Sequence, residues 1–142
     1  MSYLLDTCVV TECLKPQPEP AVQGWLDRHD SPGTFLSVLV LGEIRQGIAR
    51  VAGTAKATAL QDWLDRILLP RFDRRVLAID ERIAARWGLL RGHAMARGRT
   101  PPVIDSLLAA TAMEHRLSLV TRNERDFESL GVEVINPWPD PS

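Results

Sequence analysis

Three carboxylates stand in apolar surroundings, where an acidic side chain needs a reason to be present. Asp6 directly follows the run YLL, Glu43 lies in VLVLGEIRQGI, and Asp105 lies in VIDSLLAATA. An unpaired buried carboxylate is costly, and several carboxylates in one cleft repel each other unless a cation neutralises them. Oxygen ligands of this kind favour Mg²⁺ or Mn²⁺. If the fold brings these acids together, they predict a divalent-metal site.

Each acid also has a structural interpretation. Asp6 could cap a following helix, Glu43 could form an ion pair with Arg45 or a neighbour, and Asp105 could interact with the dipole in the first turn of its helix. These explanations must all hold at once, whereas one metal site accounts for the three acids together.

Short apolar runs alternate with helical patterns along the chain. Strands are expected at residues 3–6, 34–37, 75–79, 117–120 and 132–135, and helices at 7–14, 20–29, 38–52, 54–69, 80–98 and 100–116. Parallel strands require crossover connections, so this alternation predicts an α/β fold. We expect one domain over residues 1–142, a three-layer α/β/α arrangement around a mostly parallel sheet of about five short strands.

The expected sheet positions several polar residues at one edge. Asp6 ends the first strand, and Thr121, Asn123 and Asp126 follow the strand LSLV. Open parallel sheets bind ligands beyond the carboxyl ends of their strands. Asp105 should lie near the start of its helix, which Thr100 can cap with Pro101 in the first position.

Four segments, in this order, resemble a PIN-domain ribonuclease of the VapC toxin type. YLLDTCVVTECLKP resembles the family opening with Asp6 as its first acid, GEIRQGI matches the second acid at Glu43, and PPVIDSLLAATA matches the third at Asp105. The tail LVTRNERDFESLGVEVINPW resembles the closing motif. Cys8 stands where the family usually has Asn, and Asn123 stands where many members have a fourth acid, so that either Asp126 or a neutral Asn123 fills this position.

The resemblance implies an endoribonuclease that depends on Mg²⁺ or Mn²⁺ and leaves 5′-phosphate and 3′-hydroxyl ends. The ion would activate a water against a phosphodiester, with RNA, tRNA in particular, as substrate. The implied catalytic residues are Asp6, Glu43, Asp105 and Asp126, of which Asp6, Asp105 and Glu43 would bind metal; Thr7, Thr121 and Asn123 would orient ligands or phosphate. A cognate VapB-like antitoxin and homodimerisation are also implied, and the apolar helical hairpin at 38–69 is a candidate antitoxin surface.

The net charge of −1 neither requires nor excludes a nucleic-acid partner, but residues 71–99 hold eight arginines and three acids. Arg86, Arg91, Arg97 and Arg99 are therefore candidates for RNA contacts, although a solvated helix face is an alternative.

Other function classes fit less well. A phosphoacceptor domain needs a lysine late in the chain, yet Lys56 is the last one, and a dehalogenase-like phosphatase needs a second Asp where Cys8 stands. A non-catalytic binding module remains open. The sequence has no apolar run long enough to cross a membrane and no signal-peptide pattern, so we expect a cytoplasmic protein with Cys8 and Cys13 reduced.

Overall fold

The computed structural model describes residues 1–30 and 32–139 and contains a five-stranded sheet. The strands are β1 Tyr3–Leu5, β2 Thr34–Ser37, β3 Val76–Leu77, β4 Ser118–Val120 and β5 Val134–Ile135. Their order is β3-β2-β1-β4-β5, and each of these pairings is parallel. The predicted α/β class and the number of strands are confirmed, although β3 and β5 are each shorter than the runs 75–79 and 132–135 that were expected to form them.

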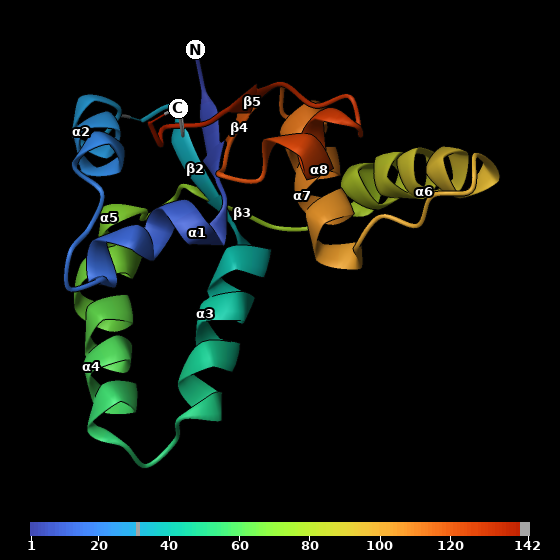
Figure 1. Cartoon of the computed structure of the whole chain (residues 1–142). Coiled ribbons are helices and arrows are strands. Elements are labelled where there is room, and N and C mark those ends of the chain that lie inside the picture. Colours follow the sequence, from blue (N-terminus) through green and yellow to red (C-terminus); the bar gives the residue numbers. More distant parts are fainter. Residues whose placement is uncertain (31, 140–142) are drawn as a thin grey trace.

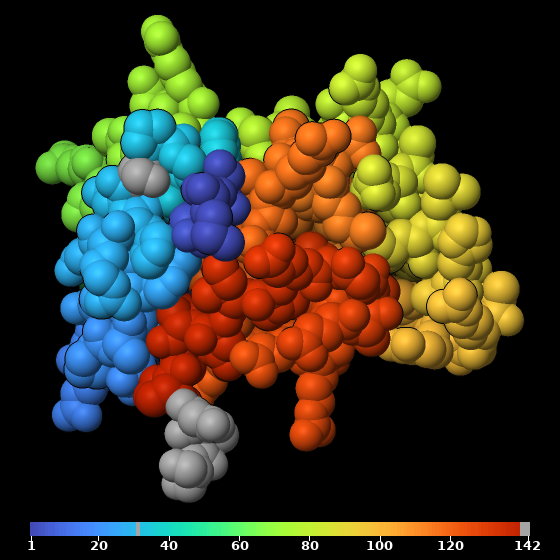
Figure 2. Space-filling view, turned by 90° about the horizontal axis from the view of Figure 1, so that it is seen from above, coloured from blue at the N-terminus to red at the C-terminus, as the bar shows by residue number. Residues whose placement is uncertain are grey.

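Helices connect the strands and flank the sheet (Figure 1). They are α1 Thr7–Val10, the 3₁₀ turn Glu12–Leu14, α2 Pro20–Arg28, α3 Val38–Arg50, α4 Ala55–Trp63, the π-helical segment Leu64–Leu68, α5 Leu69–Arg71, α6 Glu81–Ala96, α7 Val103–Glu114 and α8 Glu124–Glu128. Helices α3 and α4 project from the sheet as a hairpin (Figure 1), and α6 lies at the side of the molecule with α7 beside it (Figures 1 and 2).

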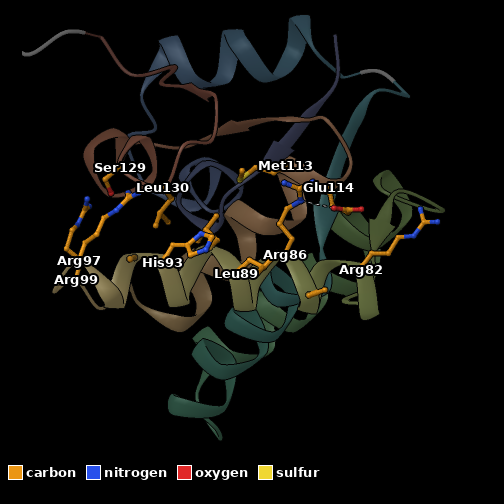
Figure 3. Close-up of a pocket in the computed structure, with 13 residues that line it drawn as sticks. Arg82, Arg86, Leu89, His93, Arg97, Arg99, Met113, Glu114, Ser129 and Leu130 are labelled. Carbon is orange, nitrogen blue, oxygen red and sulfur yellow. Dashed lines mark hydrogen bonds and ion pairs between the residues drawn. The ribbon is translucent and has the colours of Figure 1, made fainter.

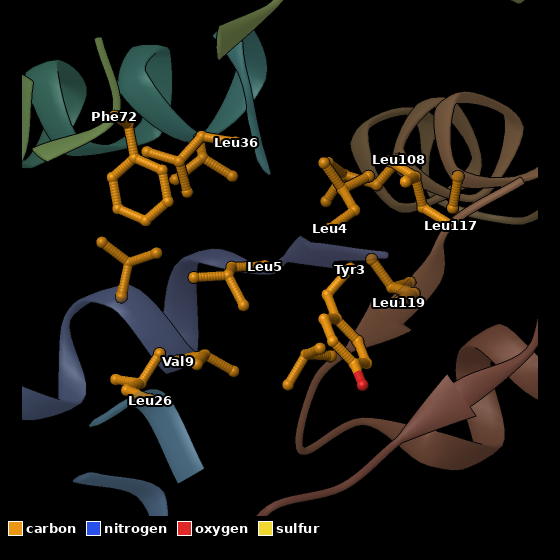
Figure 4. Packing of buried hydrophobic residues seen from close by; sticks show 14 of the residues in the cluster. Tyr3, Leu4, Leu5, Val9, Leu26, Leu36, Phe72, Leu108, Leu117 and Leu119 are labelled. Atoms are coloured by element: carbon orange, nitrogen blue, oxygen red, sulfur yellow. The ribbon is translucent and has the colours of Figure 1, made fainter. Parts of the chain in front are cut away.

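The core is built around the central strand β1. Leu4 and Leu5 are almost fully buried there, among side chains that include Leu36, Leu108 and Leu119 (Figure 4). A central parallel strand is covered on both faces, so its residues are continuously apolar. The apolar segment YLL therefore fixes the position at which the next residue, Asp6, leaves the sheet.

The second half of the predicted helix 54–69 departs from a regular α-helix. Its backbone widens into a π-helical segment at Leu64–Leu68, and this change of periodicity buries Leu64 and Leu68 while Ile67 is 58% exposed. A regular 3.6-residue period predicts one apolar stripe through Leu60, Trp63, Leu64 and Ile67, and this prediction was wrong at Ile67. A π-helical insertion shifts the buried face by an amount that a 3.6-residue period does not predict.

The predicted start of the helix carrying Asp105 was also wrong. Helix α7 begins at Val103 with Pro102 as its N-cap, so that Thr100 and Pro101 precede it. The residue before a proline is disfavoured in the helical region, and Pro102 therefore keeps Pro101 out of the helix. Asp105 consequently lies in the first turn of α7.

Two further expectations can be compared with the described residues. Cys8 and Cys13 are both free thiols. Among the helices of the described ranges, none has the length and apolarity that a membrane span requires.

Candidate active site

Asp6 is held by residues from two neighbouring strands. It is buried at the end of β1, where Oδ1 accepts a hydrogen bond from the Thr7 backbone N–H (2.8 Å) and Oδ2 accepts one from Thr121 Oγ1 (2.8 Å). The first bond caps α1, so the prediction that Asp6 caps the following helix is confirmed. The second bond crosses from β1 to the end of β4, which a cap does not require.

Thr121 links Asp6 to the turn that follows β4. It is fully buried, and its Oγ1 also accepts a hydrogen bond from the backbone N–H of Asn123 at 3.1 Å. Both residues were predicted to orient ligands. In the structure Thr121 orients Asp6 directly, whereas Asn123 acts through its backbone.

Glu43 reaches the same region from α3. Ser37 caps this helix directly after β2, and the second turn then carries Glu43, which is half-buried. Its Oε1 accepts a hydrogen bond of 2.7 Å from Thr7 Oγ1. Thr7 therefore connects the two acids, because its hydroxyl donates to Glu43 and its backbone N–H donates to Asp6. Glu43 has Thr7 as its partner in place of the ion pair with Arg45 that the sequence suggested.

The negative charges of the other three acids act on Asp105. Its pKa is raised, first by partial burial and then by the negative charges of Asp6, Asp126 and Glu43. The dipole at the start of α7 would lower this pKa, so the repulsion and the burial outweigh it. Asp6 follows β1, and the other three acids lie on α3, α7 and α8, so charges from separate parts of the chain act on Asp105.

Oxygen donors dominate this acidic cluster, which we define as Asp6, Glu43, Asp105 and Asp126. Within residues 1–30 and 32–139 no three His, Cys, Asp or Glu side chains are already close enough to share a metal ion. The donor chemistry nevertheless fits a hard divalent cation, because such an ion would relieve the repulsion that raises the pKa of Asp105. Asp6, Glu43 and Asp105 are the residues that would hold it.

Cys8 lies beside the cluster as a neutral thiol. Its Sγ is 3.8 Å from Asp6 Oδ2 and 3.8 Å from Thr121 Oγ1, and burial followed by the charge of Asp6 raises its pKa. A thiol is a weak hydrogen-bond donor. The orientation of Asp6 in this chain therefore depends on Thr121 and on the Thr7 backbone more than on the residue at position 8.

Of the four arginines considered for RNA contacts, two have hydrogen-bond partners within the protein and two are exposed. Arg86 Nε donates to Glu114 Oε2 at 2.7 Å, and Arg91 Nε donates to the carbonyl oxygen of Pro101 at 3.2 Å. Arg97 and Arg99 are exposed and line, with Arg86, a hollow of about 620 Å³ between α6 and the elements α7 and α8 (Figure 3). No member of the acidic cluster lines this hollow.

A smaller hollow of about 440 Å³ adjoins the acidic cluster, and sequence analysis did not single out most of its residues. It shares Asn123 and Asp126 with the predicted site and adds Arg122, Asn136 and Trp138, among others. Their position in the closing segments TRN and INPW was the available signal.

Comparison with known proteins identifies a family whose model matches this chain and relatives that are similar to it over nearly its whole length. The model of the PIN domain family matches residues 3–133. Toxin FitB of Neisseria gonorrhoeae is 37% identical over 96% of this chain and 99% of its own length. VapC ribonuclease Y4jK of Sinorhizobium fredii is 33% identical over 95% of this chain and 96% of its own length.

Solved structures agree with this grouping. The crystal structure of FitAcB from Neisseria gonorrhoeae contains a chain that superposes with a TM-score of 0.89 at 37% identity, covering 96% of this chain and 98% of that one. A chain in the structure of FitAB bound to an IR36 DNA fragment gives a TM-score of 0.90 at 34% identity, covering 99% and 98%.

Proposed function

The chain belongs to the PIN domain family, and from this premise we propose that it is the ribonuclease toxin of a toxin–antitoxin pair. Relatives that match over nearly their whole length are named as a toxin and as a VapC ribonuclease. We propose a Mg²⁺-dependent endoribonuclease, with Mn²⁺ as an alternative ion and tRNA as the favoured class of RNA.

One observation carries this proposal, namely the hydrogen bonds by which Thr7 holds both Asp6 and Glu43 while Thr121 holds Asp6, with Asp105 near enough that their charges raise its pKa. A binding module has no need to gather four carboxylates against their repulsion, whereas a hydrolase that uses a divalent cation does. The non-catalytic alternative is therefore less well supported.

The mechanism assigns a task to each residue. Asp6, Glu43 and Asp105 would hold the cation, which when bound would lower the pKa of a water for attack on the phosphodiester and offset charge on the leaving 3′ oxygen. Thr121 and the Thr7 backbone fix Asp6, and the Thr7 hydroxyl fixes Glu43. We assign the fourth acidic position to Asp126, because its charge acts on Asp105 while Asn123 serves Thr121 through its backbone.

Incubation of the purified protein with total RNA tests the proposal. In Mg²⁺ the wild type should cut RNA, and it should not do so in EDTA. Asp6→Asn should be inactive in Mg²⁺, although Asn caps a helix as well as Asp does. Asp62→Asn, which changes an exposed acid on α4, is the matched control and should cut normally. Identical RNA patterns for wild type and Asp6→Asn would contradict the proposal.

Arg97 and Arg99 should contribute to RNA binding by neutralising phosphates. The double change Arg97→Ala and Arg99→Ala is expected to flatten the dependence of log K on log salt by roughly 0.7 to 0.9 for each phosphate that the variant no longer neutralises. Binding titrations at several salt concentrations measure this slope. Arg86→Ala is a less clean test because it leaves Glu114 without its ion pair.

The matched control removes two exposed arginines elsewhere, Arg50→Ala at the end of α3 and Arg66→Ala in the π-helical segment. It should leave the slope unchanged. An unaltered slope in the Arg97 and Arg99 variant would identify these residues as an ordinary solvated face.

We also propose a VapB-like antitoxin as partner. The α3–α4 hairpin leads into the exposed Ile67, which lines, together with Trp63 and Cys13, a hollow of about 230 Å³. This apolar surface suits a helix or extended peptide. Homodimerisation belongs to the same proposal, and the exposed Leu89 and Met95 on α6 offer apolar surface for it.

A further inference from the structure

The hollow beside the acidic cluster is formed where two neighbouring strands end. Val120 of β4 pairs with Ile135 of β5, and the Thr121 backbone N–H donates to the Ile135 carbonyl oxygen at 3.0 Å. The segments that follow these strands therefore emerge side by side. They supply the lining residues Arg122, Asn123, Glu124, Arg125, Asp126, Asn136, Trp138 and Pro139.

Trp138 gives this hollow an aromatic surface whose position is fixed. The side chain is half-buried and packs against the hydrophobic core, and the backbone N–H of Trp138 donates to Asn136 Oδ1 at 3.0 Å. The guanidinium carbon of Arg122 lies 5.3 Å from the centre of the Trp138 ring. Aromatic rings and guanidinium planes are the surfaces on which unpaired bases stack.

The charge of Arg122 also acts on a buried acid, Glu12. Glu12 is buried and forms an ion pair with Lys15 (2.9 Å), and its pKa is lowered chiefly by the Lys15 hydrogen bond, with a smaller contribution from the charge of Arg122. The Arg122 side chain is exposed, so a ligand can reach it. Arg125 adds a second positive charge to the hollow, and Glu124 and Asp126 add two negative ones.

The hollow and the acidic cluster are connected through two residues, Asp126 and Asn123. Asp126 lines the hollow and is itself a member of the acidic cluster, so the hollow meets the cluster at that side. Asn123 makes a second connection, because its backbone N–H holds Thr121 and Thr121 holds Asp6. A nucleotide seated here would have its base near Trp138 and an adjoining phosphate near the cluster.

We propose that this hollow binds one unpaired nucleotide of the RNA next to the phosphate that is cut, with its base stacked on the Trp138–Arg122 pair. This inference rests on the proposed nuclease function and adds to it a subsite for single-stranded RNA. Stacking tolerates any base, so the subsite selects an unpaired nucleotide rather than a particular sequence.

RNA binding, measured without cleavage, tests the subsite. Asp105→Asn serves as the background so that RNA stays intact, and the probe is a labelled, random-sequence single-stranded RNA of about twelve nucleotides. Adding Trp138→Leu should weaken binding by at least about fivefold, and adding Trp138→Phe, which keeps an aromatic face, should recover most of the affinity. Trp63→Leu, which removes the half-buried tryptophan of α4 from the proposed antitoxin surface and changes no residue of this hollow, is the matched control and should bind RNA normally.

A second readout is the quenching of tryptophan fluorescence by RNA, which should be lost in Trp138→Leu and kept in Trp63→Leu. If Trp138→Leu does not fold by circular dichroism, Arg122→Gln replaces it, and this variant should both weaken binding and flatten its salt dependence. The subsite would be overturned if adding Trp138→Leu to the Asp105→Asn background left the RNA affinity unchanged. If Arg122→Gln is used instead, an unchanged affinity would have the same meaning. So would an absence of RNA binding.

The outcomes also separate the subsite from the proposed function. Cleavage by the wild type together with unchanged binding in Trp138→Leu would remove the subsite and leave the nuclease. A Trp138-dependent affinity together with no cleavage in Mg²⁺ would leave an RNA-binding module and remove the nuclease.

Discussion

Asp105→Asn is expected to slow RNA cleavage in Mg²⁺ by at least about 100-fold while the protein stays folded. Loss of a residue that only supports a metal ligand typically costs 10- to 100-fold in affinity or activity, and a ligand itself should cost no less. An amide also removes one of the four negative charges that the cluster offers to a cation. Single-turnover cleavage rates, measured beside circular dichroism spectra, give both quantities.

The control for this change is again Asp62→Asn, which should cut RNA at the wild-type rate. Asp126→Asn should lie between the two, because Asp126 is exposed on α8 and contributes to the cluster mainly through its charge. A wild-type rate in Asp105→Asn would mean that Asp105 is a structural acid.

Much of the fold was visible in the sequence because β1 and its neighbours follow simple rules. A fully buried parallel strand reads as an uninterrupted apolar run, as YLL does, and the helical segments between strands imply crossovers. The polar residue after such a run falls at the edge where ligands bind. That argument predicted Asp6 and Thr121 at the same edge, and the 2.8 Å hydrogen bond between them places them there.

The details that escaped prediction depend on contacts between distant residues. The hydrogen bond from Thr7 to Glu43 joins positions 36 residues apart, and nothing in the local sequence around either residue specifies it. The π-helical segment at Leu64–Leu68 is likewise a response to packing. Trp138 was missed because an aromatic residue near the end of a chain resembles any other core residue until its neighbours are known.

Mg²⁺ is expected to stabilise the wild type against unfolding and to stabilise Asp105→Asn much less. An ion that binds only the folded state, at 100 times its Kd, adds about 2.7 kcal/mol to the free energy of unfolding. For a chain of 142 residues this corresponds to a rise in Tm on the order of 10 °C. The physical reason is the neutralisation of carboxylates that repel one another in the metal-free protein.

The same repulsion predicts a pH dependence in EDTA. The pKa of Asp105 is raised in the folded state, so the cost of ionising it is absent below the pKa of the unfolded chain and complete above the raised folded pKa. Metal-free wild type should therefore lose stability relative to Asp105→Asn as the pH rises through that window. The difference should reach at most about 1 kcal/mol, because solvent screens a partly exposed carboxylate.

Thermal melts of wild type and Asp105→Asn at neutral pH, each in EDTA and in millimolar Mg²⁺, test most directly whether the acidic cluster is a metal site. We predict that in EDTA the variant melts at the same temperature as wild type or higher, and that Mg²⁺ raises the Tm of the wild type alone by a large amount. Unfolding of Asp105→Asn in EDTA, or an equal Mg²⁺ shift in both proteins, would contradict the assignment of Asp105 to a metal site.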